Sequence, residues 1–137
     1  MDESQISLIK NSWNSLLPQK EETGSLFYQT LFQDDTSLRY LFGTNLTGQI
    51  RKFMDMINFI VDQLHHPDQL EKELKALAHR HFQYGVLSVD YDTVGKALLK
   101  TLASQLQEEW TPETETAWQE LYRTVTQTML NSLKSPA

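Results

Sequence analysis

Four histidines are the side chains of this sequence best suited to ligate a metal or to exchange protons near neutral pH: His65, His66, His79 and His81. His81 follows Leu74 by seven residues and Leu77 by four, and this spacing places its imidazole on the apolar face of a helix. A buried polar group without a partner costs about 1–3 kcal/mol, so His81 needs either a hydrogen-bond partner or a metal. The spacing alone leaves both interpretations open.

The other three histidines are expected at the surface. His65 and His66 stand in a polar turn before Pro67, and His79 lies off the apolar stripe of its own helix. Because His79 and His81 are two residues apart, they do not share a helix face, which disfavours a site built from both.

Several other chemistries are excluded by residue type. The chain has no cysteine, which removes disulfides, iron–sulfur clusters, thiolate catalysis, cysteine zinc sites and thioether-attached haem. It contains no glycine-rich phosphate loop and no nucleophile elbow. No histidine has a glutamate three residues before it, which argues against a carboxylate-bridged di-iron bundle.

Length and charge narrow the class further. The 137 residues fit a single domain, 1–137, with 39% hydrophobic and 22% charged residues. The net charge of −6 disfavours nucleic acid and anionic membranes as partners. The acidic start, residues 1–4, has no apolar segment of the secretory kind, and no apolar run is long enough to cross a membrane, so we expect a cytoplasmic protein.

The elements that must position His81 are all helical by their periodicity. Apolar residues recur at helical spacing in seven segments, around 6–16, 24–32, 36–42, 47–64, 67–81, 90–106 and 112–129. We expect Gly43 to close the short third segment. Strand signals are absent, so the predicted class is all-α, either an irregular helical fold or an elaborated bundle.

Local residues predict where these helices begin and end. Thr47 is the expected cap of the long central helix, and Pro67–Glu71 resembles a capping box. Gly85 is expected just beyond the helix that carries His81, and Asp90 is expected to open the next one. Thr111 before Pro112 is the strongest start signal in the chain.

The stretch from Leu77 to Val86, followed by Tyr91 to Leu99, resembles the end of helix F and the start of helix G of globins. It is most similar to bacterial single-domain globins, to the haem domain of flavohaemoglobins and to neuroglobin-like proteins. In these a histidine four residues before a Gly-Val pair is the proximal iron ligand, and here that position is His81. The resemblance therefore turns His81 from a core histidine into a metal ligand.

Four further landmarks occur in the order of the family: residues 27–32 resemble helix B, 38–42 the turn that carries a phenylalanine stacked on the haem, 49–54 the distal helix E, and 117–122 helix H. Together they cover nearly the whole chain. The resemblance implies a globin fold of about seven helices, three over three, around a pocket for non-covalent haem b.

The same resemblance assigns roles to individual side chains. Phe42 packs on the haem, Tyr28 and Gln49 face the bound gas, and Phe53 lies one turn beyond Gln49. Other positions implied to line the pocket are Leu77, Val86, Tyr91, Val94, Leu98 and Val125. The cations implied as partners of the haem propionates are Arg51 and Lys52, with Arg39 as a third candidate.

The implied function is reversible binding of dioxygen, and of nitric oxide and carbon monoxide, with slow release because two donors face the gas. Nitric oxide dioxygenation with an external reductase, and haem-based gas sensing, are the alternatives. In flavohaemoglobins a tyrosine and a glutamate make the proximal histidine more basic; Tyr91 matches the tyrosine, but Leu133 stands at the glutamate position. Lys52 is a further candidate to ligate the iron when no gas is bound, and a haem-free interaction domain is the remaining interpretation.

Overall fold

The computed structural model describes residues 1–42 and 45–134, and all the regular structure within them is helical. The elements are α1 (Glu3–Leu16), η1 (Leu17–Gln19), α2 (Lys20–Asp34), η2 (Thr36–Leu41), α3 (Leu46–Asp62), α4 (Pro67–Gln83), α5 (Ser88–Leu106), η3 (Gln107–Glu109) and α6 (Pro112–Lys134). The predicted all-α class is confirmed, and the seven expected segments correspond to the six α-helices and η2. Gly43, expected to close the short segment, lies outside the described residues. No described helix is both long and apolar enough to cross a bilayer.

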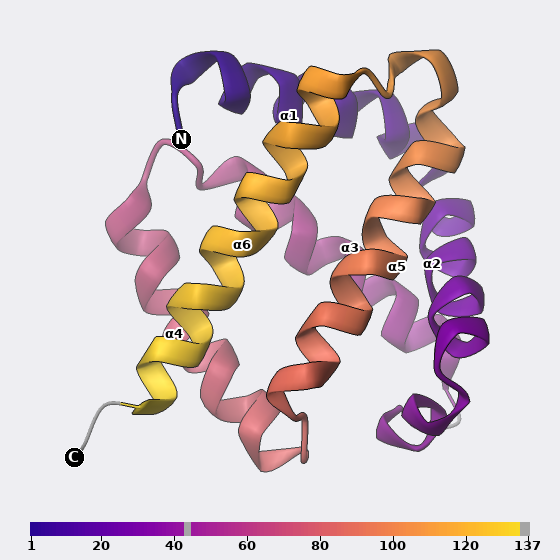
Figure 1. Ribbon diagram of the computed structural model, residues 1–137, viewed down its shortest axis with the longest axis vertical. Helices are drawn as coiled ribbons and strands as arrows, with labels where there is room; N and C mark the ends of the chain where they lie inside the picture. The colour runs from indigo at the N-terminus through magenta and orange to yellow at the C-terminus, as the bar shows by residue number, and fades with distance from the viewer. Residues whose placement is uncertain (43–44, 135–137) are drawn as a thin grey trace.

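The helices pack as crossed pairs. In Figure 1, α5 and α6 run in front of α3, with α1 along the top, α2 on the right and α4 at the lower left. Helix α2 packs against α3 and α5, whereas α4 and α1 pack against α6. Helices α3 and α4, which carry Gln49 and His81, are not among the closely packed pairs of the described chain.

Two buried tryptophans join three of these helices. The rings of Trp13 and Trp118 lie 6.2 Å apart at 54°. Trp118 donates its indole N–H to Ser12 Oγ at 2.9 Å, and Trp13 donates to Asn58 Oδ1 at 2.9 Å. Buried aromatic side chains of this size contribute much of a domain's apolar burial, and here each polar atom has its partner. Together the bonds fix α1 against both α6 and α3.

The helix boundaries show which local signals were correct. Thr111 accepts the N–H of Thr114 at the start of α6, and Gly85, with a φ of +85°, follows the end of α4, both as predicted. Thr47 was the wrong cap: the side chain of Asn45 accepts the N–H of Gly48, because α3 begins two residues earlier than a cap at Thr47 predicts.

Two further start signals were read wrongly. The capping box at Pro67–Glu71 is absent, since α4 begins with Pro67 at its first turn and no side chain caps it. A proline there has no N–H to satisfy, so the helix needs one cap fewer. Asp90 does not open α5, because that helix begins at Ser88. The Asp90 carboxylate instead accepts a hydrogen bond from the N–H of Leu87, just before the helix.

Two glycines allow helices to approach closely. A Cβ at Gly24 would lie 2.6 Å from Ile50 Cγ2 and 3.1 Å from Met54 Cγ, so a side chain there would push α3 away from α2. A Cβ at Gly95 would lie 2.5 Å from Cε2 of Tyr122, where α5 meets α6. The Tyr122 hydroxyl donates to the backbone carbonyl of Tyr91, so its ring is not free to move aside.

We expect Gly95→Ala to destabilise the protein by about 1 kcal/mol, because an overpacking cost near the middle of the range of about 1–3 kcal/mol exceeds the gain of about 1 kcal/mol in helix propensity. Urea unfolding followed by circular dichroism measures the change. Lys96→Ala, on the exposed neighbouring position of α5, is the matched control and should change the free energy of unfolding by less than about 0.5 kcal/mol. Equal stability of Gly95→Ala and the wild type would contradict the packing described.

Candidate functional site

His81 lies in the last turn of α4 and is half-buried. Its Nδ1 lies 3.0 Å from the carbonyl oxygen of Leu77, one turn earlier on the same helix. A carbonyl oxygen can only accept, so Nδ1 must carry the proton and donate it. In the neutral ring Nε2 then holds the free lone pair. That is the arrangement of an imidazole that ligates a metal through Nε2 while its other nitrogen is held by a hydrogen bond.

The surroundings of His81 keep its ring neutral. Burial lowers its pKa, the hydrogen bond to Leu77 opposes this, and the positive charge of Arg80 lowers it slightly further. The other three histidines are exposed, as expected, and His65 pairs with Glu3 at 3.1 Å. Among the described residues, no group of three or more His, Cys, Asp or Glu side chains could hold a metal ion. Among the described residues, such side chains therefore do not complete the coordination of an iron ion at His81.

Tyr28 and Gln49 place two polar groups among apolar neighbours. Tyr28 is buried on α2, and its hydroxyl lies 3.4 Å from the backbone carbonyl of Gln49 on α3, a long and weak hydrogen bond. Burial raises the pKa of Tyr28 well above its ordinary value, so the phenol keeps its proton. The half-buried side-chain amide of Gln49 makes no hydrogen bond within residues 1–42 and 45–134. The described chain thus leaves the Gln49 amide donors unused, and the single Tyr28 donor makes only a weak bond.

The ring of Tyr28 lies in a cluster of phenylalanine rings, whose distances are given between ring centroids. Phe53 stacks on Phe27 at 4.1 Å and lies 5.9 Å from Tyr28, and Phe42 meets the Tyr28 ring edge-on at 5.2 Å. Phe32 joins the cluster through Phe42 at 5.6 Å. Such a setting excludes water and strengthens any hydrogen bond that Tyr28 donates.

The ring of Tyr91 on α5 lies next to the imidazole of His81. The two rings are nearly parallel, with their centroids 6.2 Å apart. The Tyr91 hydroxyl is buried and has no hydrogen-bond partner among the described residues. Burial raises the pKa of Tyr91, so the hydroxyl is protonated. Leu133 stands at the position where the resemblance to flavohaemoglobins implies a glutamate. It is half-buried and packs against the core.

The connection from α4 to α5 is fixed by one carboxylate. Asp90 accepts the N–H of Leu87 at 2.8 Å, and the N–H of Val86 donates to the carbonyl of His81 at 3.1 Å. These bonds hold Val86 beside the histidine. We did not predict this role for Asp90, although an acidic residue three positions into a helix is a recognisable signal.

The remaining predicted lining residues divide by depth. Leu98, Val125 and Tyr91 are buried, whereas five apolar side chains nearer the surface are only partly buried: Phe42, Phe53, Leu77, Val86 and Val94. Large apolar side chains left part-exposed are ones that an apolar ligand could cover.

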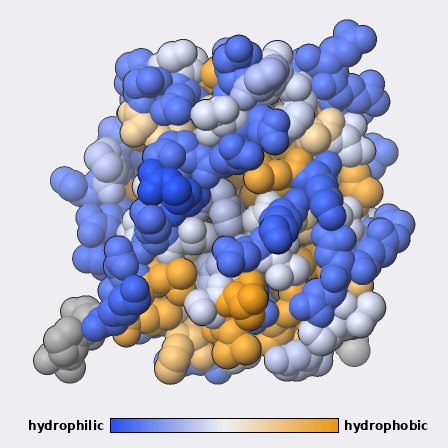
Figure 2. Space-filling view, viewed as in Figure 1, coloured by the Kyte–Doolittle hydropathy of each residue, from blue (hydrophilic) through white to orange (hydrophobic). Residues whose placement is uncertain are grey.

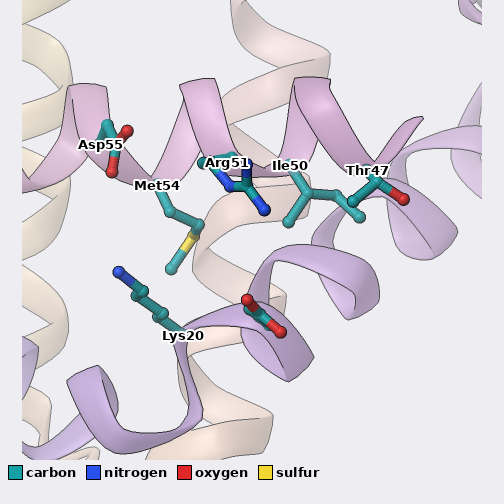
Figure 3. Close-up of a pocket in the computed structure, with 7 residues that line it drawn as sticks. Lys20, Thr47, Ile50, Arg51, Met54 and Asp55 are labelled. Carbon is teal, nitrogen blue, oxygen red and sulfur yellow. The ribbon is translucent and has the colours of Figure 1, made fainter. Parts of the chain in front are cut away.

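The three predicted cations differ in their surroundings. Lys52 is exposed on α3, and Arg39 donates to the backbone carbonyl of Phe42 at 3.0 Å. Arg51 lines a cavity of about 420 Å³ between α2 and α3. Figure 3 shows Arg51 and Met54 extending from α3 toward Lys20 on α2. Arg51 therefore lies on a face of α3 different from the one that carries Phe53.

Comparison with known proteins decides the family. The family model described as Globin matches residues 25–129, which is most of the chain. The chain belongs to the globin family. A relative from Dictyostelium discoideum, "Flavohemoprotein B", is 28% identical over 133 residues, covering 96% of this chain and 31% of the relative. A relative from Casuarina glauca, "Anaerobic nitrite reductase HBII", is 28% identical over 135 residues, covering 88% of this chain and 84% of the relative.

This globin thus spans about a third of the length of the flavohemoprotein it matches. Membership of the family implies a haem cofactor and the binding of a gas at its iron. The residues present fit that group: His81 offers a neutral imidazole with a free Nε2, and part-exposed apolar side chains flank it. Sequence reasoning identified His81, but not the carbonyl of Leu77 that fixes its tautomer. Every helical residue has such a carbonyl four positions earlier, so no sequence signal marks this one.

We expect the stability of the haem-free globin to fall as the pH drops below about 6.5, the ordinary pKa of histidine. His81 has a lowered pKa in the folded state, so between the two pKa values the unfolded chain binds more protons than the folded one. The contribution of neutral His81 to the free energy of unfolding is therefore fully present above the unfolded-state pKa. It is lost as the pH falls from that value to the folded-state pKa.

Urea unfolding at several pH values between about 7 and about 5 measures this loss. In His81→Leu the slope of stability against pH should be smaller than in the wild type. His79→Leu, which removes an exposed histidine, is the control and should keep the wild-type slope. Identical slopes for wild type and His81→Leu would show that His81 is not held neutral.

Proposed function

We propose that residues 1–137 form one cytoplasmic globin domain that holds haem b through His81 Nε2 and binds dioxygen with high affinity, and nitric oxide and carbon monoxide at the same site. The observation that carries the proposal is the hydrogen bond from His81 Nδ1 to the carbonyl of Leu77, which leaves Nε2 as the only free lone pair of a neutral ring. Haem, when bound, supplies an iron atom that binds diatomic gases reversibly.

Tyr28 and Gln49 act on the gas from the opposite side. The Tyr28 phenol and the Gln49 amide can each donate a hydrogen bond to a ligand that gains negative charge. A hydrogen bond to a charged acceptor contributes about 1.5–3 kcal/mol, and each 1.4 kcal/mol is a factor of ten in an equilibrium constant. The two donors together therefore slow release of dioxygen by at least roughly a hundredfold.

The present hydrogen bond of Tyr28 makes this donation easy. Its partner, the backbone carbonyl of Gln49, lies at 3.4 Å, so little is lost when the hydroxyl turns to a ligand. The Phe27, Phe42 and Phe53 rings hold the phenol in place while keeping water away. Slow release suits gas storage, sensing or scavenging better than bulk delivery.

The surroundings of Tyr91 favour a gas binder over a fast nitric oxide dioxygenase. Making the proximal imidazole more electron-donating requires an acceptor for its Nδ1 proton stronger than a carbonyl, such as a carboxylate. His81 has only the Leu77 carbonyl, the Tyr91 hydroxyl has no described partner, and Leu133 is apolar. Dioxygenase activity would also need electrons, which we propose come from a separate reductase.

Lys52 is the cation we propose for a haem propionate. It is exposed on α3 two turns before Ile60 and, unlike Arg51, does not line the cavity between α2 and α3. The flexible, exposed ammonium of Lys52 can pair with a propionate carboxylate. A solvent-exposed pair of this kind contributes at most about 1 kcal/mol.

We expect Tyr28→Phe to release dioxygen about tenfold faster, because it removes one donor while keeping the aromatic packing. Stopped-flow mixing of the oxygenated globin with carbon monoxide measures the rate. Tyr40→Phe, which removes an exposed phenol on η2, is the control and should release dioxygen at the wild-type rate. An unchanged rate in Tyr28→Phe would refute the role of Tyr28 as a donor.

A further inference from the structure

A cavity of about 420 Å³ lies between the start of α2 and the first turns of α3, and the proposed function does not use it. The two helices touch at Gly24, where an added Cβ would lie 2.6 Å from Ile50 Cγ2. Lys20, one turn before Gly24 on α2, borders the cavity beside that close contact. The volume falls within the range of small-molecule sites, about 300–1,000 Å³. We call this space the α2–α3 cavity.

The α2–α3 cavity has an apolar floor. Buried Met54 and half-buried Ile50, both on α3, line it. The same two side chains pack against α2 at Gly24, so the floor is held in place without a ligand. A preformed apolar surface binds a hydrocarbon group without the cost of ordering loose side chains. The cavity therefore suits a ligand that carries a small hydrocarbon group.

Charged side chains of both signs line the same cavity: Lys20, Glu21, Arg51 and Asp55. None of these side chains makes an ion pair with any residue in 1–42 or 45–134, although Arg51 and Asp55 stand at a spacing where opposite charges on a helix often pair. Exposed polar groups are ordinary on this protein, and hydrophilic side chains cover much of the face in Figure 2. These four differ because they gather around one cavity with an apolar floor.

We propose that the α2–α3 cavity binds a free α-amino acid with an apolar side chain. The mixed charges disfavour a ligand of one sign: a simple anion also meets Glu21 and Asp55, and a simple cation meets Lys20 and Arg51. An α-amino acid carries a carboxylate and an ammonium on one carbon, so it pairs with both kinds of group. A peptide does not, because its two terminal charges are separated along the chain.

The two charges on α3 match such a ligand. Arg51 and Asp55 are one turn apart on the helix, a spacing of about 5–6 Å between Cβ atoms. The guanidinium of Arg51 can hold the ligand carboxylate with two parallel hydrogen bonds, and the Asp55 carboxylate can accept from the ammonium. Figure 3 shows Ile50, Arg51 and Met54 extending from α3 toward α2, so the ligand side chain can cover Ile50 and Met54 from the same position.

Titration of the haem-loaded full chain with L-leucine, followed by the NMR shifts of backbone amides in α2 and α3, tests the proposal. We expect saturable binding of one leucine with a dissociation constant of about 1 mM, because exposed ion pairs each contribute little. Two probes keep the leucine skeleton but lose one charge: 4-methylpentanoate lacks the ammonium, and leucine amide lacks the carboxylate. Each should bind about tenfold more weakly than leucine.

Four variants locate the site. Arg51→Gln and Asp55→Asn should each weaken leucine binding about tenfold, because each leaves one charge of the ligand without its partner. Glu22→Gln on α2 and Lys72→Gln on α4 remove exposed charges that do not line the cavity, and they should bind leucine like the wild type. Circular dichroism confirms that each variant is folded. Absence of saturable leucine binding to the wild type overturns the proposal, as does equal affinity for 4-methylpentanoate or unchanged affinity in Arg51→Gln.

Discussion

The hydrogen bond from His81 Nδ1 to the carbonyl of Leu77 is the interaction on which the site depends. It fixes the tautomer of the imidazole and limits the rotation of its ring, and burial then keeps the ring uncharged. A protonated ring would offer no lone pair to a metal, and a rotated ring would direct its lone pair elsewhere. Because both partners lie on α4, the bond persists for as long as the last turn of α4 is helical.

Contacts elsewhere in the fold fix the segments that carry the proposed site residues. Tyr122 fixes the backbone of Tyr91, whose ring lies next to His81, and Asp90 orders the chain that carries Val86. Helix α3 is set by its close crossing with α2 at Gly24 and by the tryptophan bonds to α1. These contacts use neither the Tyr28 hydroxyl nor the Gln49 side-chain amide, the two groups that we propose act on the bound gas.

Helical periodicity predicted the elements well, because a stripe of apolar residues is decided by burial over many turns. Helix ends were predicted less well: Asn45 rather than Thr47 caps α3, since neighbouring polar residues compete for one cap within a single turn. Family resemblance selected His81, and the structure shows it with a defined tautomer. The sequence could not place Arg51, because α3 has two polar faces and only packing against α2 decides which one carries the arginine toward Lys20.

The most direct test of the role of His81 is the iron–histidine stretching band in the resonance Raman spectrum of the ferrous, gas-free globin. His81→Gly should lose the band, and added imidazole should restore it with a frequency shift when the imidazole is labelled with heavy nitrogen. His65, His66 and His79 remain in that variant as internal competitors. A band that persists in His81→Gly without added imidazole would show that another residue holds the iron.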